Sequence, residues 1–374
     1  MNLKNTLGVM LVLLSTVSTV RGQYTASLLD PTDAINAYGS SIAGGTQGGS
    51  VDFIGIDRAA LWSGTAASFV NLHPTGFDNS VVNAVSGSIQ VGRGQLGGSL
   101  HALLWSGTAA SVVDLHPTGF FNSYARSVSG TSQVGSGEEP ITGNLHALLW
   151  SGTAASAIDL HPTGFERSEA FGVSGGTQVG YGEQFGTFDT HALAWSGTAA
   201  SAVDLHPSSG YIESRAYAVD GTQAVGSGLS NLGDGHALLW DLSTSAITSL
   251  NPVGFTDCTA LGVSGSFQVG YGSGIATGGE DHALLWMGSA GSVVDLHGYL
   301  SSLPLTFLSS KAYGIDSNGD IVGTGYDSLG NSHALLWKSS GISSAAPEPA
   351  TLGLLALGGA LGGICAIARR RRVW

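Results

Sequence analysis

Short runs of alternating hydrophobic and polar residues follow one another along most of the chain, and the same order of runs returns several times. The copy at residues 168–210 contains four such runs, SEAFGVSGG, TQVGYG, HALAWSG and SAVDLHP. Runs of this length predict β-strands, and the dipeptides Asp220-Gly221 and Asn318-Gly319 in other copies predict hairpin turns. Each copy is therefore predicted to form four antiparallel strands, with no helical periodicity between them.

One Trp in each copy marks the period of the repeat, and consecutive Trp residues are 43, 45, 45, 45, 46 and 51 positions apart. Four strands in about 45 residues, repeated in this way, are typical of a β-propeller blade. Each Trp stands beside Leu on a strand, so we predict that it belongs to the core and buries against a neighbouring blade. The first run of each copy supplies small residues where the blades converge on the axis. The seven core Trp residues are Trp62, Trp105, Trp150, Trp195, Trp240, Trp286 and Trp337.

The two ends of the repeat region complement each other. The last copy stops after HALLWKSSGISSAAP without a fourth strand, whereas ASLLD near the start of the chain stands alone. Pairing of Ala26–Asp30 with His333–Trp337 would close a ring. The predicted fold is an all-β, seven-bladed β-propeller of four-stranded blades, closed by the N-terminal strand. A linear β-solenoid is the alternative, but it does not explain the complementary ends.

The first 22 residues predict a secretory signal peptide. Lys4 is followed by the apolar run Leu7–Val20 and then by Val20-Arg21-Gly22. This run is short for a membrane span, so an uncleaved anchor is the weaker alternative. We therefore expect a signal peptide at 1–22 and the propeller at 23–340.

The last residues predict a membrane segment with a basic end. Pro-Glu-Pro closes a linker at 341–349, and 19 uncharged residues and four Arg follow within a tail at 350–374. On physical grounds this tail spans a membrane with its Arg cluster on the cytoplasmic side. The sorting residues would be Pro347, Glu348, Pro349, Arg369, Arg370, Arg371 and Arg372.

The triplet, apolar segment and Arg cluster together resemble the PEP-CTERM sorting tail of bacterial exported proteins. The resemblance implies recognition by a membrane-bound exosortase, removal of the tail, and release to the cell envelope, surface or extracellular matrix. Contact with the membrane would occur only through the tail before processing. The repeat itself, as in SSKAYGIDSNGDIVGTGYDSLGNSHALLW, resembles the HAF family of extracellular repeats, although that family would have Phe near Leu336. It is not a WD repeat, because Trp-Asp occurs only at Trp240-Asp241.

Charge and cysteine content narrow the function. Residues 23–346 carry 25 acidic and 7 basic side chains, a net charge of −18. Nucleic acid is therefore excluded as a partner, since its phosphates require Lys and Arg. Only Cys258 remains after removal of the tail that holds Cys365, so the mature protein has no intramolecular disulfide.

The eleven His residues head the third strand or follow the fourth strand of their copies. These strands are peripheral in a propeller, so three His residues should not converge on one metal ion. We expect each His to bond backbone or carboxylate groups within its own blade. The Asp residues of the VDLH motif, such as Asp114 and Asp159, should bond turn amides or a neighbouring His.

The segments that differ between copies should all lie on one face of the ring, because they join the second strand to the third. They interleave acidic and aromatic residues, a combination suited to cations or sugars. The alternative is a solvated rim. The candidate ligand-face residues are Glu138, Glu139, Glu183, Asp189, Asp234, Glu280, Asp281, Tyr181 and Tyr271.

The symmetry of the repeat argues against a catalytic function. An enzyme needs unlike groups at one point, whereas the polar groups here recur from blade to blade. The prediction is a non-catalytic surface or matrix protein that binds exopolysaccharide or envelope components through the variable loops. We expect no cofactor, other than a divalent cation on the acidic loops, and no catalytic residue. The alternatives are a polysaccharide glycosidase or lyase, with Glu138 and Glu183 as paired carboxylates, and a scaffold for protein partners.

Overall fold

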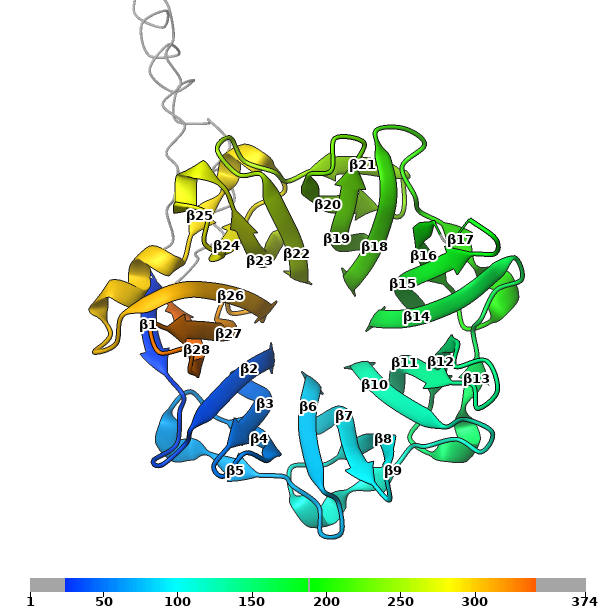
Figure 1. The fold of residues 1–374 in the computed structure, drawn as a ribbon, viewed down its shortest axis with the longest axis horizontal. Helices are drawn as coiled ribbons and strands as arrows, with labels where there is room; N and C mark the ends of the chain where they lie inside the picture. The colour runs from blue at the N-terminus through cyan, green and yellow to red at the C-terminus, as the bar shows by residue number, and fades with distance from the viewer. Residues whose placement is uncertain (1–23, 188, 341–374) are drawn as a thin grey trace, which may run out of the picture. The chain divides into compact units, whose positions relative to one another are not determined.

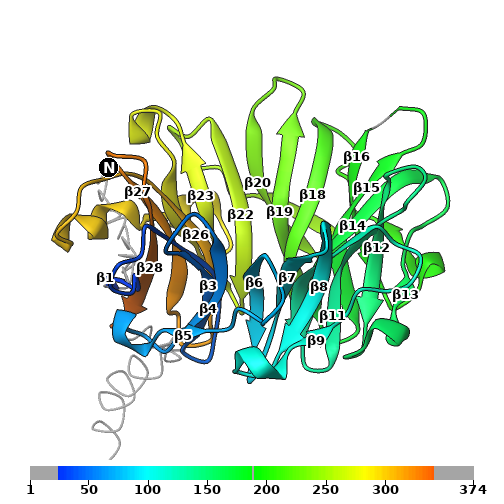
Figure 2. The same cartoon turned by 60° about the horizontal axis from the view of Figure 1, so that its bottom comes forward.

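The computed structural model describes residues 24–187 and 189–340, which form seven four-stranded antiparallel sheets around a central axis (Figure 1). Figure 2 shows the strands of each blade running between the two faces of the ring. The predicted all-β, seven-bladed propeller is confirmed. The predicted signal peptide and sorting tail lie outside the described residues. Within those residues, no helix has both the length and the apolar character needed to cross a membrane.

Each blade begins with its innermost strand and proceeds outward. Blades 1 to 3 are β2 (Asn36–Ala43), β3 (Thr46–Asp52), β4 (Asp57–Trp62) and β5 (Val70–Asn71); β6 (Asn79–Ser86), β7 (Ile89–Leu96), β8 (Ser99–Trp105) and β9 (Val113–Asp114); and β10 (Asn122–Ser129), β11 (Ser132–Glu138), β12 (Leu145–Trp150) and β13 (Ile158–Asp159). Blades 4 and 5 are β14 (Phe165–Ser174), β15 (Thr177–Gln184), β16 (Thr190–Trp195) and β17 (Val203–Asp204); and β18 (Tyr211–Asp220), β19 (Gln223–Ser230), β20 (Gly235–Asp241) and β21 (Ala246–Ser249). Blades 6 and 7 are β22 (Asp257–Ser264), β23 (Phe267–Ser273), β24 (His282–Trp286) and β25 (Val294–Asp295); and β26 (Phe307–Ile315), β27 (Ile321–Asp327), β28 (Ser332–Ser339) and β1 (Tyr24–Leu28).

The N-terminal strand closes the ring as predicted. Strand β1 is the outermost strand of blade 7 and pairs antiparallel with β28, from Tyr24 opposite Ser339 to Leu28 opposite Leu335. Its bounds begin two residues before the predicted ASLLD. Just beyond it, the carboxylate of Asp30 accepts the Ala334 amide at 2.9 Å and lies 2.6 Å from Nδ1 of His333.

The repeated Trp residues join neighbouring blades. Each of the seven is at most 2 % exposed. Trp105 of blade 2 packs in one cluster with Ala59 and Leu61 of blade 1, and Trp150 of blade 3 packs with Leu104 of blade 2. The partner is thus the preceding blade. Truncation of such a side chain to Ala typically costs about 3–5 kcal/mol of stability.

The two inner strands of every blade approach closely at a repeated Gly. A Cβ atom on Gly180 would lie 1.9 Å from the carbonyl oxygen of Glu169, and the equivalent Gly residues give 1.8–2.0 Å. No side chain fits in that space, which explains the recurrent Val-Gly of the second run. The seven positions are Gly49, Gly92, Gly135, Gly180, Gly226, Gly270 and Gly323.

The His residues divide into two sets with different partners. Five of the six that head the third strand bond a carboxylate of their own blade, as His146 Nδ1 does with Asp159 Oδ2 at 2.9 Å, whereas His236 bonds the Tyr211 hydroxyl. The expectation of bonding within one blade is wrong for the second set. His161 lies 2.9 Å from the hydroxyl of Ser168 on the next blade, and that hydroxyl accepts the Ala147 amide of the preceding blade.

The second set therefore forms inter-blade bonds. Nε2 of His161 donates to the carbonyl of Phe165 at 3.1 Å, which leaves Nδ1 to accept the Ser168 hydroxyl hydrogen. The neutral ring satisfies both bonds. The interface between blades 5 and 6 departs from this pattern, because Asn251 accepts the Ala237 amide and Cys258 replaces Ser. The His residues of the second set are His73, His116, His161, His206 and His297.

Gly180→Ala should destabilise the fold by about 1–3 kcal/mol, because the added methyl group meets backbone rather than a movable side chain. Gly176→Ala is the matched control, since no atom lies within 4 Å of its new Cβ. Urea denaturation of both variants measures the difference. Equal midpoints would contradict the close approach of the inner strands.

Acidification should weaken the ring. Burial lowers the pKa of all five inter-blade His residues below the usual 6.5. The unfolded chain then binds more protons than the folded chain just below pH 6.5, so stability falls as the pH decreases from about 7 to about 5. Thermal unfolding across this range measures the slope. His161→Asn, which introduces the residue found at Asn251, should reduce the slope of stability against pH. An unchanged slope would show that the inter-blade His residues do not cause it.

Candidate active site at the axial funnel

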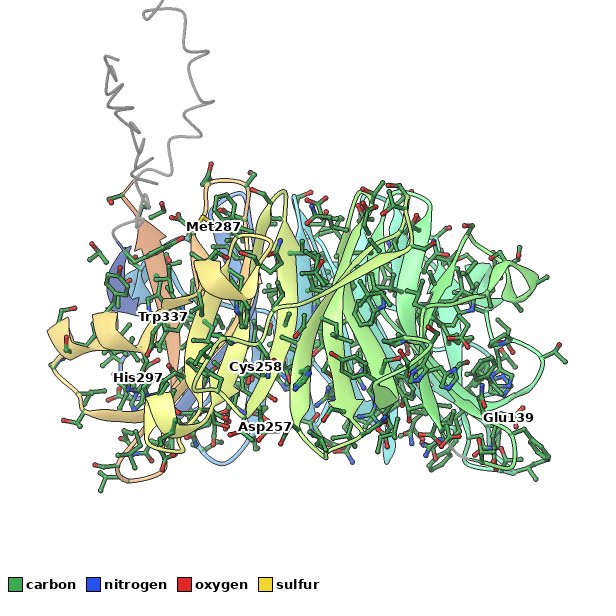
Figure 3. All side chains as sticks on the ribbon, turned by 90° about the horizontal axis from the view of Figure 1, so that it is seen from above. Glu139, Asp257, Cys258, Met287, His297 and Trp337 are labelled. Carbon is green, nitrogen blue, oxygen red and sulfur yellow. The ribbon has the colours of Figure 1, made fainter. Side chains whose placement is uncertain are left out.

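The two faces of the ring carry different loops. Figure 3 places Glu139 and Asp257 at one face and Met287 at the other. Glu139 belongs to the loop between β11 and β12, whereas Met287 follows the third strand of blade 6. The loops between second and third strands therefore open on the face of Glu139, here called the variable-loop face.

A β-bulge occurs at the same position of every inner strand, and the bulged residues line a cavity of about 230 Å³ on the axis. A bulge leaves one residue out of the ladder and redirects its side chain. The symmetric backbone thus presents seven side chains of different character, including an Arg and three aromatic rings. The predicted small residues are present on the inner strands, but the bulged position departs from them. The bulged residues are Ser40, Asn83, Arg126, Phe171, Tyr217, Leu261 and Tyr313.

A second layer lies toward the variable-loop face, two residues before each bulge. Here an inner-strand side chain contacts the second strand of the preceding blade: Arg215 lies 5.3 Å above the Tyr181 ring, and Lys311 lies 4.1 Å above the Tyr271 ring. We call this layer and the bulged residues the axial funnel. The inner-strand members are Tyr38, Val81, Tyr124, Glu169, Arg215, Thr259 and Lys311, and the second-strand members are Ser50, Arg93, Ser136, Tyr181, Ser227, Tyr271 and Thr324.

Cations concentrate in the funnel although the chain is acidic. The described residues contain seven Lys and Arg side chains. Four of them, Arg93, Arg126, Arg215 and Lys311, belong to the funnel. An acidic molecule thus carries more than half of its described positive charge around its axis.

Arg93 and Arg126 form a cluster with Tyr124 where blades 2, 3 and 4 meet. Arg126 Nη2 pairs with Oε1 of the buried Glu169 at 3.1 Å, and its guanidinium lies 5.3 Å from the centre of the Tyr124 ring. Burial, together with repulsion from Arg126, lowers the pKa of Arg93. Within the described residues, no carboxylate comes within ion-pair distance of Arg93. Of these two guanidinium groups, Arg126 alone is paired with a carboxylate within the described residues, which leaves Arg93 able to bind an anion.

Tyr124 is held in its protonated form at neutral pH. Burial raises the pKa of its phenol, and the negative charge of Glu138 acts in the same direction. Arg126 and Arg93 oppose the shift but do not reverse it. The hydroxyl group is therefore a proton donor beside two cations.

Glu138 is the predicted ligand-face residue that belongs to this cluster. It ends β11, and its Oε2 accepts the side-chain amide of Asn122 at 2.7 Å. Glu139 lies in the adjacent loop, 3.7 Å from His146. Asp281 is paired with Lys311 at 2.9 Å. Glu183 lies on β15, opposite Arg167 in the register, while Asp189, Asp234 and Glu280 lie in loops of the variable-loop face.

Tyr181 and Tyr271 were predicted to lie on the variable loops, and this prediction is wrong. They are on β15 and β23 and form part of the funnel wall. The reason is the two-residue period of a strand: each Tyr stands between Gly residues that face the opposite side of the sheet. Arg93, Arg126 and Glu169 were missed altogether. The sequence feature that could have identified them is a change of residue type at one position in otherwise similar copies.

In the described part of the chain, no group of three or more His, Cys, Asp and Glu side chains is placed to hold a metal ion. A divalent cation on the acidic loops therefore stays a prediction.

Comparison with protein families identifies one segment. Residues 345–372 match the PEP-CTERM protein-sorting motif. This motif implies recognition by an exosortase-type processing enzyme and export to the envelope or surface of a bacterium. The comparison with curated proteins gives no match.

Solved structures share the fold at low identity. An oligogalacturonate lyase in complex with manganese is 12% identical with a TM-score of 0.56, over 86% of this chain and 94% of that one. The oligogalacturonate lyase from Vibrio parahaemolyticus gives 12% and 0.55, over 84% and 93%. A prolyl endopeptidase gives 13% and 0.56, over 81% of this chain and 47% of that one. Identities this low establish the propeller fold alone.

These comparisons correct the functional prediction made from the sequence. That prediction took radial repetition as an argument against catalysis and assigned a non-catalytic surface protein. Solved propellers that share this fold include a lyase and peptidases, so radial repetition is no argument against catalysis and the argument from symmetry is wrong. The funnel of this chain is itself asymmetric, because its equivalent positions carry unlike groups.

Proposed function

We propose that the protein is a polysaccharide lyase that acts on a uronate-containing chain at the axial funnel. The observation that carries the proposal is the pair of guanidinium groups, Arg93 and Arg126, beside the protonated phenol of Tyr124. A uronate carboxylate would give Arg93 the ion-pair partner that it lacks within the described residues. The oligogalacturonate lyases that share the fold act on a substrate of this class, which supports the proposal without carrying it.

β-Elimination uses each group of the cluster once. Arg93 and Arg126 bind the substrate carboxylate and stabilise the negative charge that develops when the neighbouring C5–H bond breaks. Glu138, whose Oε2 is oriented by Asn122, accepts that proton. The electron pair forms the C4–C5 double bond, and the C4–O bond breaks as Tyr124 protonates the leaving oxygen. Exchange with solvent then returns both side chains to their starting states.

Glu169 acts as a positioning residue in this scheme. Its side chain is 3 % exposed, its Oε1 pairs with Arg126, and its Oε2 accepts the Ser136 hydroxyl at 2.8 Å. Both oxygens are therefore occupied, and the group fixes the Arg126 guanidinium at the funnel. Hydrolysis would instead need a second carboxylate across the bond. The two guanidinium groups favour elimination, because neutralising the carboxylate of a uronate makes the neighbouring C5–H proton more acidic.

The place of action follows from the sorting motif. An exported enzyme of this kind would meet bacterial or environmental polysaccharide outside the cytoplasm. The resemblance of the repeats to extracellular HAF repeats and the predicted signal peptide agree with that location. Removal of the sorting tail would leave the propeller free of the membrane.

Cleavage of polygalacturonate, alginate and other uronate polymers should release products with the ultraviolet absorbance of a C4–C5 double bond. Arg93→Gln should lower kcat/KM by about 100-fold, because one group that stabilises the developing charge is lost. Lys338→Ala is the control for a lost cation, since Lys338 lies outside the funnel and is 68% exposed. New reducing ends without this absorbance would indicate hydrolysis, and absence of cleavage across the panel would exclude the proposal.

Tail removal is testable in the native host. Intact-mass analysis should find protein that ends near Pro347–Pro349, without Arg369–Arg372. Glu348→Ala should leave the tail attached and the protein in the membrane fraction. If wild-type protein also retains its Arg cluster, the segment is an anchor rather than a processed sorting signal.

A further inference from the structure

Three equivalent positions lie together at each of the funnel interfaces between blades 4 and 5, 5 and 6, and 6 and 7. They are the funnel residue of the second strand, a residue near the start of the third strand, and the funnel residue of the next inner strand. The three positions are Tyr181, Thr190 and Arg215 between blades 4 and 5, Tyr271, Asp281 and Lys311 between blades 6 and 7, and Ser227, Gly235 and Thr259 between blades 5 and 6.

The small side chains between blades 5 and 6 leave a groove of about 210 Å³. Tyr fills the second-strand position on either side of it, and Gly235 contributes no side chain at all. The Gly235 amide donates to Asp257 at 2.8 Å, which ties the two blades together across this gap. The groove is lined by Glu213, Arg215, Ser227, Leu229, Gly235 and Thr259.

The chemistry of the groove suits an acidic sugar. Arg215 and Glu213 are each 40% exposed in their side chains, and their closest approach is 3.5 Å, a loose pair that solvent or a ligand can separate. Ser227 and Thr259, two residues with hydroxyl groups, line the same groove. A guanidinium for a carboxylate and hydroxyl groups for ring hydroxyls are the polar contacts that a hexuronic acid requires.

A continuous series of ring contacts joins the groove to the cluster of blades 2 to 4. The Arg126 guanidinium lies 5.6 Å from the Phe171 ring. Phe171 stacks on Tyr181 at 5.7 Å, and Tyr181 lies under Arg215 at 5.3 Å. The Ser227 hydroxyl lies 3.5 Å from Tyr217 in the axial cavity. The groove and the cluster are thus linked by direct contacts between stacked rings and guanidinium groups.

We infer that the groove between blades 5 and 6 is a subsite for a uronate unit of the same polysaccharide, remote from the bond that is cleaved. The inference rests on the proposed function for the identity of the chain. It assigns Arg215 to the carboxylate of that unit and Ser227 and Thr259 to its hydroxyl groups. Substrates long enough to reach the groove therefore bind more tightly than short ones.

Ser227→Tyr tests the subsite by filling the groove with the residue that stands at the same position in blades 4 and 6. Isothermal titration with uronate oligosaccharides of increasing length should show the Kd of long oligomers rising about tenfold, the loss of one good contact. The Kd of the shortest oligomer that binds should rise by less than the Kd of the long oligomers. Arg215→Gln should likewise raise the Kd of long oligomers more than that of short ones, without adding bulk to the groove. Ser243→Tyr, at an exposed turn of blade 5, is the control for the substitution itself.

The outcomes separate the two proposals. If long oligomers bind and are cleaved equally well by wild type, Ser227→Tyr and Arg215→Gln, the subsite is excluded while the lyase proposal stands. If wild type binds uronate oligomers with this dependence on length but cleaves none, the subsite stands and the lyase proposal fails. If neutral oligosaccharides bind as tightly as uronates, the assignment of Arg215 to a carboxylate is wrong.

Discussion

The contact between each repeated Trp and the preceding blade is the interaction on which the ring depends. A blade has two apolar faces, and neither can be covered except by a neighbour, so no blade is stable by itself. The pairing of β1 with β28 completes the last blade and lets Trp62 of blade 1 pack against Leu336 of blade 7. Because Cys258 of the described residues is a free cysteine, this closed set of interfaces carries the stability of the ring without a disulfide there.

The same constraint divides the residues of each copy into two groups. Positions that meet a neighbouring blade or strand, such as Trp105 and Gly180, have a fixed volume and recur with little change. The bulged position of the inner strand faces the axial cavity instead, and it varies freely between Ser, Arg and Tyr. A symmetric scaffold can therefore hold an asymmetric site, provided that the site is built only from the free positions.

Charge follows the same division. The acidic side chains that recur, such as Asp114 and Asp159, bond His residues and turn amides at the periphery. The cations instead gather in the funnel, where Glu169 and Asp281 fix two of them and Arg93 has no such partner within the described residues. This unequal pairing is the physical basis for expecting an anionic ligand at the axis.

The sequence by itself determined the fold, since a period of about 45 residues, four runs per period and complementary ends leave a closed seven-bladed ring as the simplest solution. It also identified Glu138 as a candidate. Only the tertiary structure brought Arg93, Arg126 and Tyr124 together, because they come from different strands and their proximity depends on the bulge and on the angle between blades. Local patterns specify strands and turns, whereas the neighbours of a funnel residue are decided by the packing of the whole ring.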